Sequence, residues 1–238
     1  MIETTNTVFI TGADKGLGLS MAERFLRGSF QVFAGIYLSG KNLEELVGQF
    51  PGKLTPIGLD VTDLTCVQRA ARTVAEQTPA LDILINNAAV YLQKPVKPLE
   101  ELDFTDMHFQ KTMDVNAFGP LRVSQQFLTL LEKGGRKLIV NISSEAGSIA
   151  DCSRTSEYAY CMSKSALNIA SKILQNCLKP RGFKVLVIHP GWMRTDMGGP
   201  DADIHPDQAA EGIFALAMKK WQPDDEVYMD YRGQVLPW

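Results

Sequence analysis

Short apolar runs alternate along this chain with stretches of helical periodicity. The run at residues 83–85 is apolar without alternation, as in parallel strands that helices cover on both faces. The pattern predicts an α/β fold, a single Rossmann-like, doubly wound parallel sheet of about seven strands with helices on both faces. The runs predicted to be strands are 7–10, 31–34, 54–59, 83–85, 137–142, 184–188 and 226–229.

The stretch after Asp63 shows the helical pattern between these runs. Leu64, Val67, Ala71 and Val74 are spaced to form one apolar stripe, and Asp63 is placed as an N-cap. This spacing predicts a crossover helix. Because no internal repeat, low-complexity tract or Pro/Ser-rich linker divides the sequence, we expect residues 1–238 to form one dinucleotide-binding and catalytic domain.

The composition, with 45% hydrophobic and 21% charged residues, is that of a globular chain with a real core. The formal charge of −3 gives no electrostatic reason to expect nucleic acid or an acidic membrane surface as a partner. No apolar run approaches the ~18 residues that cross a bilayer, and the first predicted strand leaves no room for a signal peptide, so we expect a cytoplasmic protein. The four cysteines and three histidines are scattered, which predicts neither a disulfide framework nor a metal site.

A glycine-rich loop follows the first predicted strand and precedes a predicted helix; positions 11–18 are TGADKGLG. Glycines there permit a tight turn and the close approach of a pyrophosphate, whose charge the helix N-terminus favours. The alternative is three turn glycines with no ligand. The strand before the loop and the helix after it favour a dinucleotide site.

Tyr160 and Lys164 are four residues apart and therefore share one face of a predicted helix. A free phenol titrates near pKa ~10, and we expect a neighbouring ammonium to favour the phenolate. Tyr158 is a built-in control, because its neighbour at the same spacing is Met162.

Two adjacent serines follow the strand predicted at 137–142, at the edge where open α/β sheets place ligands. Successive side chains on an extended segment face opposite ways, so only one of Ser143 and Ser144 can point at a substrate carbonyl.

Four motifs occur in one order: TGxxxGxG at 11–18, NNAA at 86–89, YxxxK at 160–164 and PGxxxT at 190–195. Over essentially its whole length the chain resembles the single-domain short-chain dehydrogenases/reductases. Within that family, segments 189–199 and 231–238 are similar to the sniffer-type carbonyl reductases and the C-factor-like proteins.

The resemblance implies a catalytic set of Asn116, Ser144, Tyr160 and Lys164. Tyr160 would move the proton while hydride passes between nicotinamide and a carbonyl carbon, and Ser144 would steady the oxygen, leaving Ser143 structural. Lys164 would tune Tyr160 and hold the nicotinamide ribose, and Asn116 would sit in a helix distortion that holds a water contacting Lys164. The implied activity is that of an NAD(P)-dependent oxidoreductase, an NADPH-dependent carbonyl reductase in particular.

The resemblance also implies the cofactor contacts. Asp60 and Val61 would border the adenine, Asn87 and Ala88 would line the adjoining ribose, and residues 190–195 would hold the nicotinamide end. Ala89 departs from the family, which usually has glycine there. The full set of expected contacts, besides Tyr160 and Lys164, is Gly12, Asp14, Lys15, Gly16, Leu17, Gly18, Tyr37, Asp60, Val61, Asn87, Ala88, Ala89, Pro190, Gly191, Met193 and Thr195.

The second predicted strand carries no acid near its end; the first acid after it is Glu44, on the following helix. NAD-specific sites place a carboxylate there for the ribose 2′-hydroxyl, so its absence favours NADP, with NAD as the alternative. Lys15 lies where NADP-dependent family members often carry a basic residue, and Tyr37 is placed to stack on the adenine.

Other functions stay open on the sequence alone. A C-factor-like signalling or regulatory protein would need the glycine loop but not Ser144, Tyr160 and Lys164 together. An epimerase or methyltransferase would need a different glycine spacing. We expect a small-molecule carbonyl or alcohol substrate, a homo-oligomer as in the family (dimer or tetramer), and no metal. The long loop at 145–157 is expected to wall the pocket, and segment 198–203 is either a surface loop or a substrate lid.

Overall fold

The computed structural model describes residues 6–93, 95–222 and 224–238. Seven parallel strands form one sheet in the order β3-β2-β1-β4-β5-β6-β7. In sequence order the strands are β1 Thr7–Thr11, β2 Gln31–Ile36, β3 Leu54–Gly58, β4 Ile83–Asn86, β5 Leu138–Ile142, β6 Lys184–His189 and β7 Tyr228–Asp230. The predicted fold class is confirmed, and the strand bounds shift by at most a few residues.

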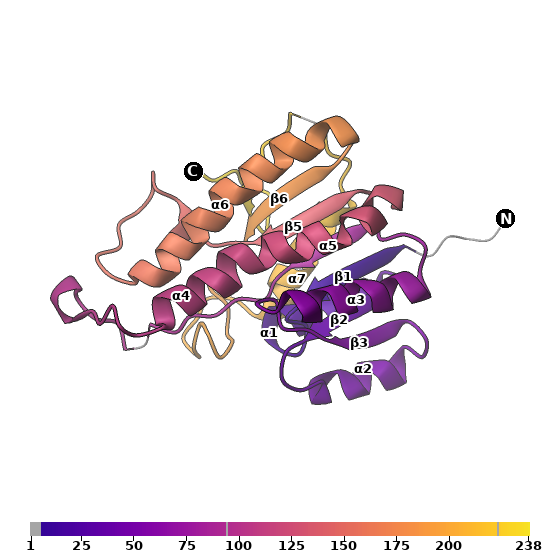
Figure 1. The fold of residues 1–238 in the computed structure, drawn as a ribbon, viewed down its shortest axis with the longest axis horizontal. Coiled ribbons are helices and arrows are strands. Elements are labelled where there is room, and N and C mark those ends of the chain that lie inside the picture. The colour runs from indigo at the N-terminus through magenta and orange to yellow at the C-terminus, as the bar shows by residue number, and fades with distance from the viewer. Residues whose placement is uncertain (1–5, 94, 223) are drawn as a thin grey trace.

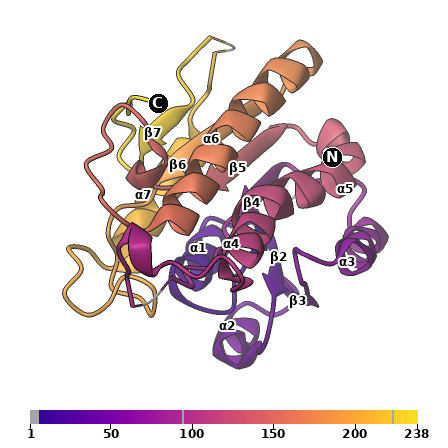
Figure 2. The ribbon, with the colours of Figure 1, turned by 60° about the vertical axis from the view of Figure 1, so that its left-hand side comes forward.

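Helices cover both faces of this sheet (Figures 1 and 2). One apolar core packs α1 and α7 against one face, and a second core packs α3 and α5 against the other. The helices are α1 Gly16–Arg27, α2 Glu44–Gln49, α3 Leu64–Gln77, α4 His108–Met113, α5 Gly119–Lys133, α6 Tyr158–Leu178 and α7 Pro206–Met218. Within the described residues, no helix is long and apolar enough to cross a membrane.

The helix predicted after Asp63 is α3, and the carboxylate of Asp63 accepts a hydrogen bond from the backbone N–H of Thr65, as expected of an N-cap. Its predicted apolar stripe is partly wrong. Val67 and Val74 are buried and Ala71 packs partly buried against the core, but Leu64 is 45% exposed. Cys66 and Ala70 also lie on the buried face. Leu64 is the first residue of the helix, so the predicted stripe is exposed to solvent at its N-terminal end.

The direction in which successive strands are added to the sheet reverses between β1 and β4. From β1 the chain moves outward through β2 to β3, then returns to place β4 on the other side of β1. Ligands of open α/β sheets bind at such a reversal, outside the carboxyl ends of the strands. The fold therefore places a ligand site where β1 and β4 end.

The second core gives a test of the packing. The ring of Phe127 on α5 is fully buried and lies 4.4 Å, centroid to centroid, from the ring of Phe9 on β1. Phe127→Ala should reduce the free energy of unfolding in urea by about 3–5 kcal/mol because it leaves a cavity. Phe104→Ala is the control: Phe104 is 66% exposed, so a change of about 0.5 kcal/mol or less is expected. Equal losses in the two variants would contradict the assignment of Phe127 to the core.

Candidate active site

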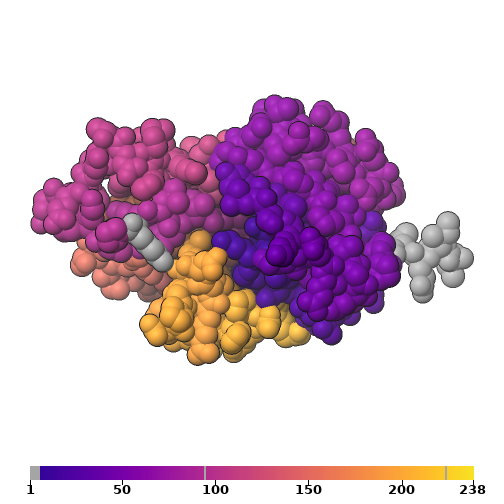
Figure 3. Space-filling model, turned by 90° about the horizontal axis from the view of Figure 1, so that it is seen from below, coloured from indigo at the N-terminus to yellow at the C-terminus, as the bar shows by residue number. Residues whose placement is uncertain are grey.

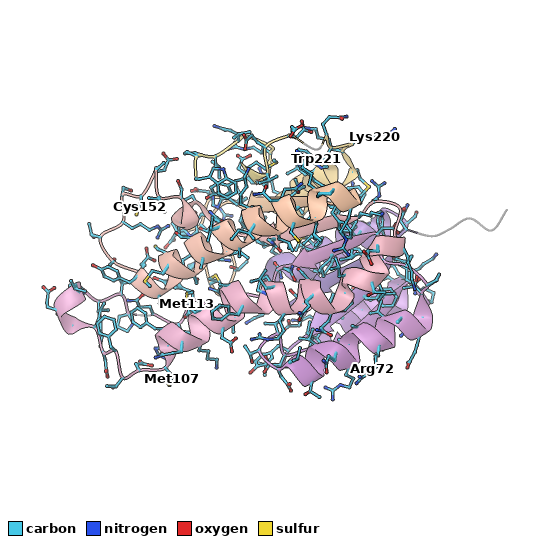
Figure 4. All side chains as sticks on the ribbon, turned by 45° about the horizontal axis from the view of Figure 1, so that its top comes forward. Arg72, Met107, Met113, Cys152, Lys220 and Trp221 are labelled. Atoms are coloured by element: carbon cyan, nitrogen blue, oxygen red, sulfur yellow. The ribbon has the colours of Figure 1, made fainter. Side chains whose placement is uncertain are left out.

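A cleft of about 1160 Å³ lies at the carboxyl ends of the strands. Every residue predicted to bind cofactor lines it, together with Ser144, Tyr160 and Lys164. The structure therefore brings together all of the predicted site residues except Asn116, which lies behind the lining. Figure 4 shows Cys152, on the loop before α6, and Met107, just before α4, at the same end of the molecule as the start of α6.

The glycine loop forms a cradle that side chains would fill. Gly12 has φ +62°, and a Cβ there would lie 2.9 Å from the Cα of Ala88. A Cβ on Gly18 would lie 2.0 Å from the carbonyl oxygen of Gly12. Helix α1 begins at Gly16 with no acidic residue in its first turn and no side-chain cap, so its first N–H groups can receive an anion. This geometry fits a dinucleotide pyrophosphate.

Thr11 and Asn87 hold this cradle to the end of β4. The hydroxyl oxygen of Thr11 accepts hydrogen bonds from the backbone N–H groups of Asn87 and Ala88, both at 2.9 Å. In return the amide of Asn87 donates to the carbonyl oxygens of Thr11 (2.9 Å) and Gly12 (3.0 Å). Asn87, which was expected to line the ribose, therefore also fixes the loop that would hold the phosphates.

The two serines after β5 have different surroundings. The hydroxyl of Ser143 donates to the side-chain oxygen of Asn168 on α6 at 2.6 Å, and both residues are buried. The hydroxyl oxygen of Ser144 accepts from the N–H of Ala146 at 3.1 Å and lies within hydrogen-bonding reach of Tyr160. Ser143 is thus tied to α6 through Asn168, whereas Ser144 lies beside Tyr160.

Tyr160 and Lys164 lie one turn apart on α6, with the Nζ of Lys164 5.7 Å from the centre of the Tyr160 ring. Lys164 is 2% exposed, and its ammonium donates to the carbonyl oxygen of Ile142 at 2.9 Å. Burial lowers the pKa of Lys164 to about 8 and raises that of Tyr160 to about 12, while the hydrogen bond with Ser144 opposes the rise.

The expected lowering of the phenol pKa by Lys164 is therefore absent from this state of the molecule. Loss of water around Tyr160 disfavours the phenolate, and this effect is larger than the favourable contacts of the ring. The ammonium of Lys164 is directed at the Ile142 carbonyl oxygen. Below a pH of about 12 the phenol keeps its proton, so the arrangement is that of a proton donor.

Asn116 lies in a π-helical turn, Asp114–Phe118, between α4 and α5. The helix distortion implied by the family resemblance is thus present. The side-chain oxygen of Asn116 accepts from the N–H of Val90 at 2.8 Å, and its amide donates to the carbonyl oxygen of Val90 and to the hydroxyl of Ser163. Asn116 therefore ties the segment after β4 to the helix that carries Tyr160.

The segment after β6 closes over the glycine loop. Figure 3 shows its golden surface beside the indigo surface of the N-terminal part of the chain. A Cβ on Gly16 would lie 3.3 Å from a methyl carbon of Thr195, and the ammonium of Lys15 forms an exposed ion pair with Asp196 at 2.7 Å. Segment 198–203 is anchored through Ala202, which is fully buried and whose carbonyl oxygen accepts from Arg194.

The sequence analysis did not single out five charged or polar residues that line the cleft. They form a chain of contacts: the hydroxyl of Tyr91 donates to Glu157 at 2.5 Å, and Arg154 bridges Glu157 and Glu145. Nδ1 of His189, at the end of β6, lies 3.3 Å from Glu145. The unusual length of loop 145–157, which was expected to wall the pocket, was a sequence signal for the three that it contains, Glu145, Arg154 and Glu157. The five are Tyr91, Glu145, Arg154, Glu157 and His189.

In the part of the chain that the structure describes, no group of three or more His, Cys, Asp or Glu side chains is placed to hold a metal ion, and the four cysteines are free thiols.

Residues 6–204 match the family model of the short chain dehydrogenases, and the chain belongs to that family. The C-signal protein of Myxococcus xanthus is 37% identical over 161 residues, which are 68% of this chain and 95% of that protein. The carbonyl reductase Sniffer of D. melanogaster superimposes with a TM-score of 0.92 at 27% identity, covering 99% of this chain and all of the other. The NADPH-bound carbonyl reductase from chicken fatty liver gives 0.90 at 28% identity, covering 98% and 99%.

Proposed function

We propose that this protein is an NAD(P)-dependent carbonyl reductase, acting on a small-molecule carbonyl or alcohol. The observation that carries the proposal is the convergence of Ser144, Tyr160 and Lys164 in one cleft beside a glycine cradle. A bound nicotinamide would supply or accept the hydride. Both solved structures compared above are named as carbonyl reductases, which supports this activity.

The side chains of this chain supply the proton chemistry. Tyr160, with its pKa raised by burial to about 12, carries a proton at neutral pH and donates it to the substrate oxygen as hydride reaches the carbon. Ser144 orients that oxygen. Lys164, whose pKa is about 8, is a cation below that pH. It does not lower the pKa of the resting phenol, but from 5.7 Å its ammonium stabilises negative charge that develops on the ring as the proton leaves.

The remaining contacts hold the cofactor. The N-terminus of α1 binds the pyrophosphate, and Asn87 with Ala88 faces the adenine-side ribose. Asp60 and Val61 border the adenine, at the turn after β3 where Asp60 accepts a hydrogen bond from the N–H of Thr62. Residues 190–195 hold the nicotinamide end.

NADP is the proposed cofactor form. The end of β2 offers no carboxylate to a ribose 2′-hydroxyl, and Lys15 stands at the cleft with an ammonium that can meet a 2′-phosphate. The structure described as NADPH-bound is a similar one. We further propose a single-domain, cytoplasmic protein that forms a homo-oligomer.

A second candidate function is signalling through dinucleotide binding, favoured by the similarity to the C-signal protein. A panel of aldehydes and ketones, assayed for oxidation of NADPH and NADH, separates the two. Turnover of a carbonyl compound supports the reductase, and cofactor binding without turnover across the panel supports the signalling protein.

Tyr160→Phe should reduce kcat/KM by at least ~100-fold, because it removes the proton donor. Cofactor affinity should be retained, since the glycine cradle is untouched. Tyr158→Phe is the matched control and should leave kcat/KM near the wild-type value. The assignment fails if the Tyr160 variant keeps more than about a tenth of wild-type kcat/KM, or if the Tyr158 variant is the slower of the two.

Lys164→Met should lower turnover and weaken cofactor binding, because one ammonium serves both the phenol and the ribose. In the wild type, activity that depends on this cation falls as the pH rises through about 8. The variant has no titrating ammonium, so the basic limb of its residual pH–rate profile should move upward. An unchanged limb with only KM altered would contradict the tuning role.

Lys15→Ala should weaken NADPH binding by about one to two powers of ten and leave NADH binding nearly unchanged, because only NADPH carries the 2′-phosphate. Fluorescence titration of the wild type and the variant with each cofactor measures this. Tighter binding of NADH by the wild type, or an NADPH affinity that the substitution does not change, would show that NADP preference is wrong.

A further inference from the structure

The carboxylate of Glu145 accepts the hydrogen bond that the hydroxyl of Ser144 donates. The hydroxyl of Ser144 donates to Oε2 of Glu145 at 2.7 Å, and its oxygen accepts from the N–H of Ala146 at 3.1 Å. A hydroxyl has one proton. While Ser144 donates to Glu145, it cannot donate to a substrate oxygen.

The position of Glu145 is fixed by the chain of contacts along loop 145–157. Arg154 bridges Glu145 and Glu157, and Glu157 in turn accepts from the hydroxyl of Tyr91. Glu157 has φ +65°, a left-handed conformation that is costly for a residue with a side chain. The ion pair with Arg154 holds the carboxylate of Glu145 beside the hydroxyl of Ser144.

Glu145 is ionised at neutral pH. Burial raises its pKa, but the hydrogen bond from Ser144, the nearby His189 and the contacts with Arg154 outweigh this effect and lower the pKa below the ordinary value. Burial also lowers the pKa of His189, which keeps its imidazole neutral at pH 7. The titratable and charged groups around Glu145 and its neighbour His189 are Arg154 and Glu157 of the loop, Tyr160 and Cys161 of α6, His189 of β6, Tyr228 and Asp230 of β7, and Arg232.

We propose that Glu145 is a positioning residue that turns the Ser144 hydroxyl away from the substrate oxygen, so that ionised Glu145 restrains carbonyl reduction. This inference rests on the proposed function. When Glu145 loses its negative charge, by protonation or substitution, the hydroxyl of Ser144 can donate its hydrogen bond to the substrate oxygen instead.

Two physical effects of the ionised Glu145 carboxylate would slow carbonyl reduction. A carboxylate is a stronger acceptor than a neutral carbonyl oxygen, so the substrate must displace the better partner of Ser144. In the transition state of reduction, negative charge also develops on the substrate oxygen, one hydroxyl group away from the Glu145 carboxylate. Like charges at that separation oppose each other, most strongly where water is excluded.

Glu145→Gln is the direct test. The substitution keeps the shape of the side chain and removes its charge, so kcat for carbonyl reduction with NADPH should rise about fivefold with KM little changed. The wild type should speed up as the pH falls toward the pKa of Glu145, and the variant should not. A decrease in kcat, or the same acid-side rise in both proteins, would overturn the proposal.

Arg154→Met is a second, independent test of the role of Glu145. Without the guanidinium, the pKa of Glu145 rises, so the acid-side increase in kcat should begin at a higher pH than in the wild type. A profile that stays in place would also overturn the proposal. This arm gives an answer even if the Glu145 variant does not fold, and thermal unfolding with NADPH titration checks each protein.

Two variants separate Glu145 from its neighbours. Glu157→Gln removes a carboxylate that contacts Arg154 but not Ser144, so it should keep the wild-type acid-side rise. His189→Gln removes an imidazole that also titrates in the acid range. Because His189 helps to lower the pKa of Glu145, the rise should persist in this variant and begin at a higher pH. Loss of the rise would transfer the effect to His189 and contradict the proposal. Failure of the proposed function is a different result, namely no turnover by the wild type.

Discussion

The burial of one ammonium group constrains the whole active site. Lys164 is 2% exposed, and its Nζ donates to the carbonyl oxygen of Ile142, where β5 ends. A buried cation is costly unless it has partners, so the positions of α6 and the end of β5 are coupled through it. That coupling places Tyr160 one turn before Lys164 and Ser144 two residues beyond Ile142, at the mouth of the cleft.

The elements around this pair are tied together by polar side chains. Asn116, in its π-helical turn, joins the segment after β4 to α6, and Asn87 joins the same strand end to the glycine cradle. The candidate proton donor and the candidate phosphate site are therefore built from one strand end. A shift of β4 would therefore disturb both.

The fold was predictable from the sequence because the two periodicities are clear and the central strands are apolar on both faces. The glycine loop, the Tyr160 and Lys164 pair and the serines at a strand end could be predicted from local features, and the resemblance to the family implied the other candidate site residues. The loop contacts were not predictable: Arg154 reaches Glu145 and Glu157 only through the path of an irregular loop. The effect of burial on Tyr160 was also out of reach, because the sequence shows which residues are neighbours along a helix and not how much water surrounds them.

Transfer of a labelled hydride is the most direct test of the central claim that this cleft reduces carbonyl compounds. The protein would be incubated with an aldehyde and NADPH carrying deuterium at both C4 positions of the nicotinamide, and the alcohol would be analysed by mass spectrometry. The account predicts one deuterium on the carbinol carbon of the product. Cofactor that binds tightly while no deuterated alcohol forms from any aldehyde or ketone tested would contradict it.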